Sequence, residues 1–248
     1  MNIGIIGAGH IGKTLALELS KTGYDVKVAN SRGPESVDPS VLVFGARAVT
    51  IEQAVEDVDV LVLSIPLNRV PEIAPKLAAL PKDVIVIDTS NYYPLRDTEI
   101  ADIEAGEAES VWVSKQLGRP VAKAWNAIGS DSFARLGKPA GDPDRIAIPV
   151  AADDERDRRV AMALVGDTGF DAVDAGSLAI SWRQQPGAPG YCTDLTANEM
   201  PGALAAAERS RLPKRRDLSV AAVQERLGDT KSNPDADFLV RLNRALFI

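Results

Sequence analysis

A glycine-rich segment near the start of the chain has the residue types and spacing of a phosphate-binding turn. Gly7, Gly9 and Gly12 follow the apolar run Ile3–Ile6 in the pattern G-x-G-x-x-G, and the next two residues extend it to G-x-x-x-x-G-K-T. Both patterns place a glycine turn between a strand and the N-terminus of a helix. Free backbone N–H groups and the helix dipole favour an anionic group there. The predicted phosphate site comprises Gly7, Ala8, Gly9, His10, Ile11 and Gly12.

The segment after the second predicted strand indicates which phosphorylated ligand binds. In dinucleotide-binding folds an acidic residue roughly 20 positions past the glycines hydrogen-bonds the ribose 2′-hydroxyl. Here the strand Val26–Ala29 is followed by Asn30, Ser31 and Arg32, with no carboxylate. A hydroxyl and a guanidinium can bind a 2′-phosphate, which a carboxylate would repel. We therefore predict that the cofactor is NADP(H) rather than NAD(H).

A nucleoside triphosphate site is the alternative interpretation of the same glycines. Lys13 and Thr14 could contact phosphate and magnesium, and Asp88 follows the apolar run Val84–Ile87 as a metal-binding acid would. This interpretation does not require Gly9 and does not explain the turn at residues 30–32. The dinucleotide interpretation is therefore favoured, and it requires no metal ion. Magnesium-dependent ATP binding that survives excess NADPH would support the alternative.

Polar residues also follow the other predicted strands. In an open parallel sheet the ligand lies beyond the carboxyl ends of the strands. Ser64, Ile65 and Pro66 are therefore expected along the pyrophosphate and nicotinamide ribose, and Asn126 is expected near the reacting rings. Ordinary strand-end hydrogen bonding explains Ser64 equally well. Trp125 could form a wall for a flat ring or belong to the core, and Asn126 could orient a carbonyl group or close a turn.

The elements that position these residues alternate between strands and helices. Such alternation is typical of a parallel sheet covered on both faces. Strands are predicted at 3–6, 26–29, 59–65, 84–87, 111–113, 121–124 and 146–150, and helices after the glycine turn and at 50–55, 70–80, 97–105 and 154–165. The predicted fold class is α/β, a Rossmann-type doubly wound, mainly parallel sheet with a C-terminal appendage. Residues 1–180 are assigned to the NADP-binding domain with its last strands, and residues 181–248 to a C-terminal extension of a loop followed by helices.

Composition and charge exclude several classes of protein. The chain has 248 residues and a net charge of −7, so neither a nucleic acid nor an anionic membrane is an expected partner. A single cysteine, Cys192, excludes an intrachain disulfide and a multi-cysteine zinc site. The first strand begins almost at Met1, which leaves no room for a signal peptide, and no apolar run is long enough to cross a bilayer. We expect a cytoplasmic protein with a small-molecule substrate.

Taken together, six segments resemble the coenzyme F420-dependent NADP oxidoreductase family. They occur in matching order over about residues 1–180: Gly7–Gly12, Asn30–Arg32, Ser64–Pro66, Val121–Asn126, Ile148–Asp154 and Asp174–Leu178. The resemblance implies a Rossmann fold and direct hydride transfer between NADPH and a deazaflavin, with the two rings stacked in a cleft that the C-terminal part closes. It also implies that Ser31 and Arg32 hold the 2′-phosphate and that Asn126 lies near the second ring.

The C-terminal part of the chain departs from this family. A short apolar helix is expected after Leu178, whereas Ser181–Cys192 is polar and rich in turn residues. Roughly helical segments follow to Ile248, and the last has an apolar stripe beginning at Phe238. This tail is expected to pack on the core or on a second subunit. In the second case the protein would be a homodimer. The sequence also leaves four alternatives for the second substrate: F420, a flavin, a quinone-like acceptor or a small carbonyl compound.

The sequence contains no obvious proton donor for carbonyl chemistry. His10 lies inside the glycine turn, and the residues four positions after Tyr92 and Tyr93 are Arg96 and Asp97 rather than lysine. Hydride transfer between two flat rings requires mainly that donor and acceptor be held in contact. The sequence therefore favours transfer to F420 or a flavin-like acceptor, with no catalytic residue assigned.

Two other functions remain open at this stage. The chain could reduce a small carbonyl or imine, with an acid among Asp88, Tyr92 and Lys123. It could also sense NADPH without catalysis, because a fold by itself does not define a function.

Overall fold

The centre of the protein is a six-stranded parallel sheet with the strand order β3-β2-β1-β4-β5-β6. The structure is a computed structural model that describes residues 1–228 and 232–248. The strands are β1 (Asn2–Ile6), β2 (Asp25–Ala29), β3 (Arg47–Val49), β4 (Val60–Leu63), β5 (Ile85–Asp88) and β6 (Ala122–Lys123). The order reverses between β1 and β4, which opens a crevice at their carboxyl ends. The predicted Rossmann-type fold is confirmed.

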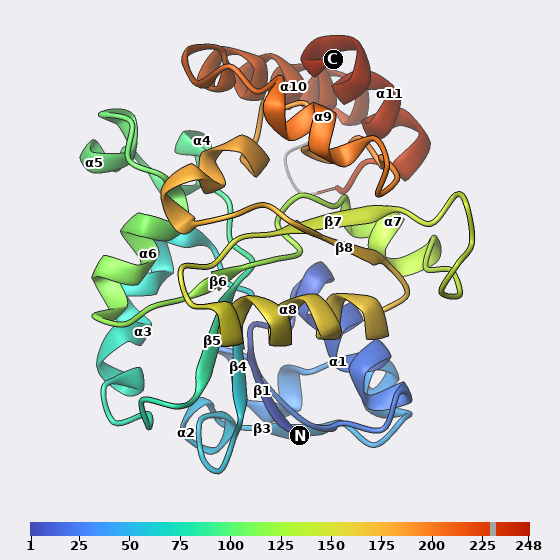
Figure 1. Cartoon of the computed structure of the whole chain (residues 1–248). Coiled ribbons are helices and arrows are strands. Elements are labelled where there is room, and N and C mark those ends of the chain that lie inside the picture. The colour runs from blue at the N-terminus through green and yellow to red at the C-terminus, as the bar shows by residue number, and fades with distance from the viewer. Residues whose placement is uncertain (229–231) are drawn as a thin grey trace.

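Helices cover both faces of this sheet, as Figure 1 shows. One face packs against α1 (His10–Lys21), α7 (Ser130–Arg135) and α8 (Glu155–Asp167), and the other against α2 (Ile51–Ala54), α3 (Val70–Leu77) and α6 (Glu109–Leu117). Because both faces are covered, every residue of β4 is buried, and its sequence Val-Leu-Val-Leu is apolar throughout. Apolar side chains from alternate strand positions thus form two separate cores.

A second, two-stranded parallel sheet follows the first. It consists of β7 (Ala147–Val150) and β8 (Asp171–Asp174), which α8 connects. An isolated antiparallel bridge between Lys123 and Ala151 links it to the end of β6. Short elements complete this part of the chain: α4 (Pro94–Asp97), α5 (Ala101–Glu104) and the 3₁₀ helices η1 (Pro34–Ser36), η2 (Pro39–Leu42) and η3 (Leu67–Arg69).

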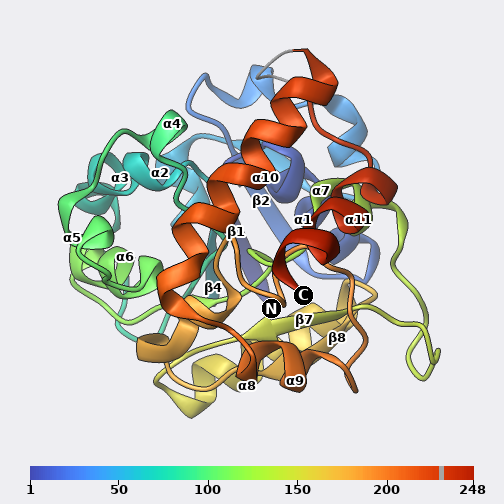
Figure 2. The same ribbon diagram turned by 90° about the horizontal axis from the view of Figure 1, so that it is seen from above.

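The C-terminal region lies over the carboxyl ends of the sheet strands (Figures 1 and 2). It comprises η4 (Leu178–Gln184), α9 (Met200–Ala205), η5 (Arg209–Arg211), α10 (Leu212–Leu227) and α11 (Ala236–Phe247). Tyr191, Leu212 and Phe247 share an apolar cluster with Ala127, so this region packs on the rest of the chain, which is the first of the two alternatives considered from the sequence. The domain division at residue 180 stays a prediction. Among the described residues, no helix combines the length and apolar character that crossing a bilayer requires.

Two predicted elements are wrong. The strand expected at 111–113 is part of helix α6, because Trp112 and Val113 are buried in the core against α3, and Gly118 ends the helix with a φ of 63°. Tertiary packing here overrides the β-propensity of the valines. The helix expected at 97–105 is instead the two short helices α4 and α5, since Thr98 has a φ of 60° and interrupts it. Strands β3 and β8 are not predicted from the sequence.

Candidate active site

A cavity of about 460 Å³ lies between the carboxyl edge of the sheet and the C-terminal helices. Its lining begins at the glycine turn, continues along the residues that follow β4, β5 and β6, and ends on α10, α11 and the loop at 186–192. Most of these segments are far apart in the sequence. The strand order brings them together, because all six strands of the main sheet end at the same edge.

The three glycines of the turn differ in what surrounds them. A Cβ atom added at Gly7 would lie 2.1 Å from the Ser64 carbonyl oxygen, and one added at Gly12 would lie 1.8 Å from the Gly7 carbonyl oxygen. A Cβ at Gly9 would meet no heavy atom within 4 Å. Gly7, with a φ of 110°, and Gly12 are therefore required by the turn and the helix packing, whereas Gly9 leaves space on the cavity side. This is the division of roles expected around a bound pyrophosphate.

The start of α1 is also suited to an anion. Gly9 is its N-cap residue and provides no side-chain cap, and the first turn contains no acidic residue. The first-turn N–H groups of a helix have no partner within the helix, so an anionic ligand can accept from them. His10 and Ile11 line the cavity at this point. The residues present therefore fit a pyrophosphate.

The turn after β2 provides an unpaired hydroxyl and an unpaired guanidinium. Ser31 and Arg32 are exposed, and neither side chain has a hydrogen bond or ion pair among the described residues. They lie outside the cavity itself, next to β2, which is the strand beside β1 in the sheet. Because no described protein group is bonded to these two side chains, both are available to the 2′-substituent of an adenosine ribose held at this edge.

The triphosphate interpretation lacks support from the structure. The Thr14 hydroxyl donates to the His10 carbonyl oxygen inside α1, at 3.0 Å. Asp88 is fully buried, and its carboxylate accepts from the Ser90 hydroxyl at 2.6 Å and the Ser110 hydroxyl at 2.6 Å. Neither side chain is therefore presented to a metal ion at the cavity.

Asp88 belongs to a buried cluster of charged groups beneath the cavity floor. The Lys123 ammonium lies 3.5 Å from Asp88 and 3.6 Å from Glu109, and it donates to the Ser90 carbonyl oxygen at 2.9 Å. Burial raises the pKa of Glu109 to about 7, although the positive charge of Lys123 opposes this. The third acid candidate, Tyr92, donates to Glu104 at 2.8 Å. None of the three acids considered in the sequence lines the cavity.

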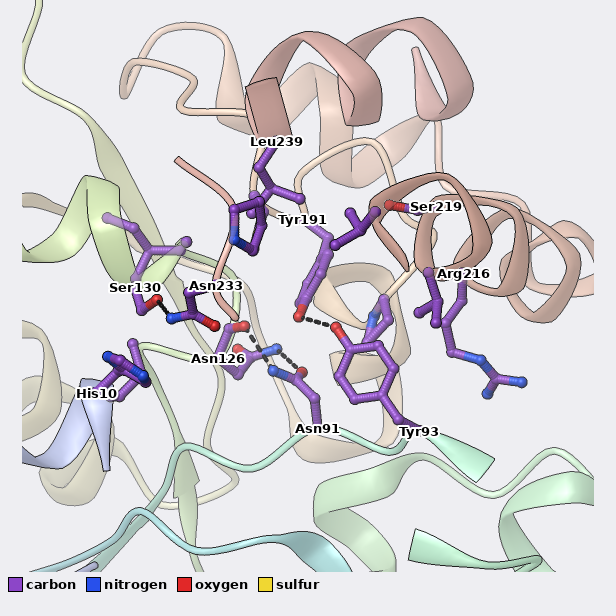
Figure 3. A pocket seen from close by; sticks show the side chains of 18 of the residues that line it. His10, Asn91, Tyr93, Asn126, Ser130, Tyr191, Arg216, Ser219, Asn233 and Leu239 are labelled. Atoms are coloured by element: carbon purple, nitrogen blue, oxygen red, sulfur yellow. Dashed lines mark hydrogen bonds between the residues drawn. The ribbon is translucent and has the colours of Figure 1, made fainter. Parts of the chain in front are cut away.

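Two asparagines form the centre of the cavity wall (Figure 3). The Asn126 side-chain amide donates to the Asn91 side-chain oxygen at 3.1 Å and to the Gln184 carbonyl oxygen at 2.7 Å. Its own side-chain oxygen accepts from Gln184 Nε2 at 2.8 Å, so the Asn126 amide is fully engaged with protein. Next to it, Trp125 has a φ of 55°, donates to the Thr168 hydroxyl at 3.3 Å, and contributes to both the cavity wall and the core.

Two tyrosines that the sequence did not suggest as a pair meet in the cavity. The hydroxyl oxygens of Tyr93 and Tyr191 are 2.6 Å apart, and both residues line the wall beyond the asparagines (Figure 3). Burial is the main cause that raises the pKa of both phenols. The Arg96 guanidinium lies 5.3 Å from the centre of the Tyr93 ring. No local pattern could reveal this pair, because 98 positions separate its members.

The predicted site residues thus occupy three places. Those that line the cavity are Gly9, His10, Ile11, Ser64, Ile65, Pro66 and Asn126. Gly7, Ala8 and Gly12 form the turn behind it, and Asn30, Ser31 and Arg32 lie along the sheet edge. Their roles toward a ligand stay predictions.

The fold and the glycine turn define a class of protein. A doubly wound sheet of this strand order, with G-x-G-x-x-G at its first strand–helix crossing, is characteristic of NAD(P)-dependent oxidoreductases. Residues 2–92 match the family described as NADP oxidoreductase, coenzyme F420-dependent. Protein YjhV of Escherichia coli K12 is 44% identical over 101 residues, which is 39% of this chain and 70% of YjhV. The chain belongs to the coenzyme F420-dependent NADP oxidoreductase family.

Solved structures agree on the fold. The hypothetical protein SMa0349 from Sinorhizobium meliloti is 29% identical, with a TM-score of 0.67 over 79% of this chain and 95% of its own. A "putative f420 dependent nadp-reductase" from Arthrobacter sp. FB24 is 16% identical, with a TM-score of 0.57 over 95% of this chain and 98% of its own. At that identity the second likeness establishes the fold alone.

Proposed function

We propose that the protein transfers a hydride between NADP(H) and a second flat-ring acceptor, coenzyme F420 or a flavin. The glycine turn binds the pyrophosphate, and Ser31 and Arg32 bind the 2′-phosphate. Ser64, Ile65 and Pro66 lie along the nicotinamide ribose. When bound, NADPH supplies the hydride, and the protein supplies the position of both rings and the exclusion of water.

The observation that best supports this proposal is the continuity of the cavity. Its lining runs without interruption from Gly9 at the helix N-terminus, past Asn126, to residues of α10 and α11. A volume of about 460 Å³ is in the range of sites that hold a small molecule. A ligand anchored by its phosphates at the glycine turn would extend along this lining toward the C-terminal helices. Membership of an F420-dependent family supports a flat ring as the acceptor.

A specific observation also favours a second candidate, the reduction of a small carbonyl or imine. Hydride addition to a carbonyl carbon leaves charge on oxygen, which requires a proton donor beside it. Tyr93 and Tyr191 provide hydroxyl groups in the cavity, which the acids considered from the sequence, Asp88, Tyr92 and Lys123, do not line. The acceptor end of the cavity is built largely from the C-terminal region that departs from the family, so this region determines which acceptor fits.

Oxidation of NADPH against a panel of acceptors tests these candidates. The panel contains F420, FMN, FAD, quinones and simple carbonyl compounds, with NADH measured in parallel. We expect F420 or a flavin to react fastest and NADPH to be preferred over NADH. Turnover with carbonyl compounds alone would replace the first candidate with the second. Tight NADPH binding without oxidation by any acceptor would indicate a sensing protein instead.

A further inference from the structure

The hydroxyl pair in the cavity gives the reaction a proton donor. We propose that Tyr93 donates the proton that the acceptor takes up on reduction, and that Tyr191 and Arg96 stabilise the phenolate that remains. This inference rests on the proposed oxidoreductase function and assigns its missing acid. Tyr93 is the catalytic residue, whereas Tyr191 and Arg96 act through it as positioning residues.

Hydrogen bonding and exposure together favour Tyr93 as the donor. The two hydroxyl groups share one hydrogen bond of 2.6 Å, which uses one of their two protons. Neither hydroxyl has another hydrogen-bond partner among the described residues, but Tyr191 is buried whereas Tyr93 is only partly buried. When Tyr191 donates to Tyr93, the remaining Tyr93 proton is free for a molecule in the cavity.

The two hydroxyl groups that follow β5 are already committed. Thr89 donates to the Leu63 carbonyl oxygen at 3.1 Å, and the Ser90 hydroxyl donates to Asp88 at 2.6 Å. His10 also lines the cavity, but it lies at the glycine turn, on the opposite side of the asparagine pair from the tyrosines (Figure 3). The tyrosine pair is therefore the acid on the side where an acceptor would bind beyond the nicotinamide.

The surroundings of Tyr93 favour the protonated phenol in the resting protein and stabilise the phenolate that forms during the reaction. Burial raises the pKa of Tyr93, and negative charge at Cys192 or Glu109 would raise it further. The hydrogen bond with Tyr191 and the positive charge of Arg96 lower it. Arg96 is fixed in place by Asp97, which accepts from it at 2.9 and 2.7 Å. The phenol is thus neutral at physiological pH, with a donor and a cation beside it.

The proposed step is balanced. The acceptor gains the hydride with its electron pair, so that a new C–H bond forms and NADPH becomes NADP⁺. The electron pair displaced onto the acceptor's oxygen or nitrogen takes the Tyr93 proton as the O–H bond breaks. The phenolate then regains a proton from solvent. No further oxidant or reductant is needed.

The test compares Tyr93→Phe and Tyr191→Phe with the control Tyr24→Phe, using the acceptor that the unmodified enzyme reduces fastest. Tyr24 lies outside the cavity, and its hydroxyl donates to Asp167 at 2.5 Å, so the control also removes one hydrogen bond of a tyrosine hydroxyl. We expect Tyr93→Phe to lower kcat by about 100-fold or more, in the range of a lost general acid. We expect a smaller loss for Tyr191→Phe and none for Tyr24→Phe. NADPH affinity, measured by fluorescence, should stay within about twofold of the unmodified value in all three variants, because none of these changes removes a contact that binds NADPH equally in the ground state and the transition state.

Two further readouts separate catalysis from folding. The kcat of Tyr93→Phe should rise as pH falls, because solvent must now supply the proton, and its melting temperature should stay near that of Tyr191→Phe. The Tyr93 ring ¹³C signal is assigned as the tyrosine signal that is missing from the spectrum of Tyr93→Phe. In the ligand-free protein this signal should keep the chemical shift of a neutral phenol from pH 6 to pH 10. An undiminished kcat in Tyr93→Phe, or a phenolate signal at neutral pH, would overturn the inference. An unmodified enzyme that reduces no acceptor would instead overturn the proposed function on which it rests.

Discussion

The two ends of the cavity are built in different ways. We expect the glycine turn to act through backbone N–H groups and through the absence of side chains, so that six consecutive residues suffice for it. The opposite wall acts through side chains from α4, the loop at 186–192 and the last two helices, and its central pair joins residues 98 positions apart. The turn packs directly on the sheet at Gly7 and Gly12, whereas the second wall lies beyond the ends of the strands. The family match is accordingly confined to residues 2–92.

The strongest test of this comparison is the substitution Gly9→Ala. The added methyl group meets no protein atom, so the free energy of unfolding should be unchanged. It would occupy the space predicted for the pyrophosphate, and overpacking of about 1–3 kcal/mol corresponds to a loss of NADPH affinity on the order of 100-fold. Calorimetric titration with NADPH and thermal unfolding measure the two effects.

The matched control is Gly12→Ala. Its Cβ would lie 1.8 Å from the Gly7 carbonyl oxygen, so this change should lower stability as well as binding. If Gly9→Ala lost stability while binding NADPH normally, the turn would be a structural feature with no ligand.

The second prediction concerns Arg32→Asp. The Arg32 side chain has no partner in the part of the chain that the structure describes, so stability should not change. A carboxylate would repel the 2′-phosphate and remove a charged hydrogen bond of about 1.5–3 kcal/mol. We expect NADPH affinity to fall by about 30-fold and NADH affinity to stay within a few-fold, as measured by competition binding. Equal losses for the two nucleotides would show that residues 30–32 do not select between them.

The same contrast explains what the sequence could predict. The strand, glycine turn and helix at the start of the chain follow local rules, and the structure places them as expected. The segment 181–192 looks like an exposed polar loop, yet Gln184 and Ala188 are completely buried. The Gln184 side-chain amide donates to Asn126 and Pro149, which only tertiary structure brings near. The Tyr93–Tyr191 pair could not be predicted for the same reason.

A third prediction tests the connection between the two ends. Gln184 Nε2 donates to the Asn126 side-chain oxygen at 2.8 Å and to the Pro149 carbonyl oxygen at 3.1 Å. Gln184→Leu would leave both acceptors buried without a donor, so the free energy of unfolding should fall by about 2 kcal/mol. Denaturant unfolding measures this. The adjacent Gln185 is the control, because its Nε2 atom has no hydrogen-bond partner. Equal losses for Gln184→Leu and Gln185→Leu would mean that these bonds do not hold the wall in place.

The smallest expected effect concerns the charged cluster beneath the cavity. Glu109 is buried beside Lys123 and Asp88, with the positive charge of Arg216 also acting on it, and burial raises its pKa from 4.5 to about 7. Because the folded state holds this proton more tightly than the unfolded state, the contribution to stability is complete below pH 4.5 and is lost as pH rises through 7. Glu109→Gln keeps a neutral group and leaves the Asp88–Lys123 pair in place.

The measurement is denaturant unfolding of both proteins between pH 5 and pH 8. We expect the unmodified protein to lose on the order of 1 kcal/mol relative to Glu109→Gln over this interval. Parallel stability curves would show that Glu109 is ionised throughout and that the Lys123 charge outweighs its burial. In that case the floor beneath the strand ends would be a fully charged network, and the cofactor end of the cavity would depend on side-chain charge as well as on the backbone of the turn.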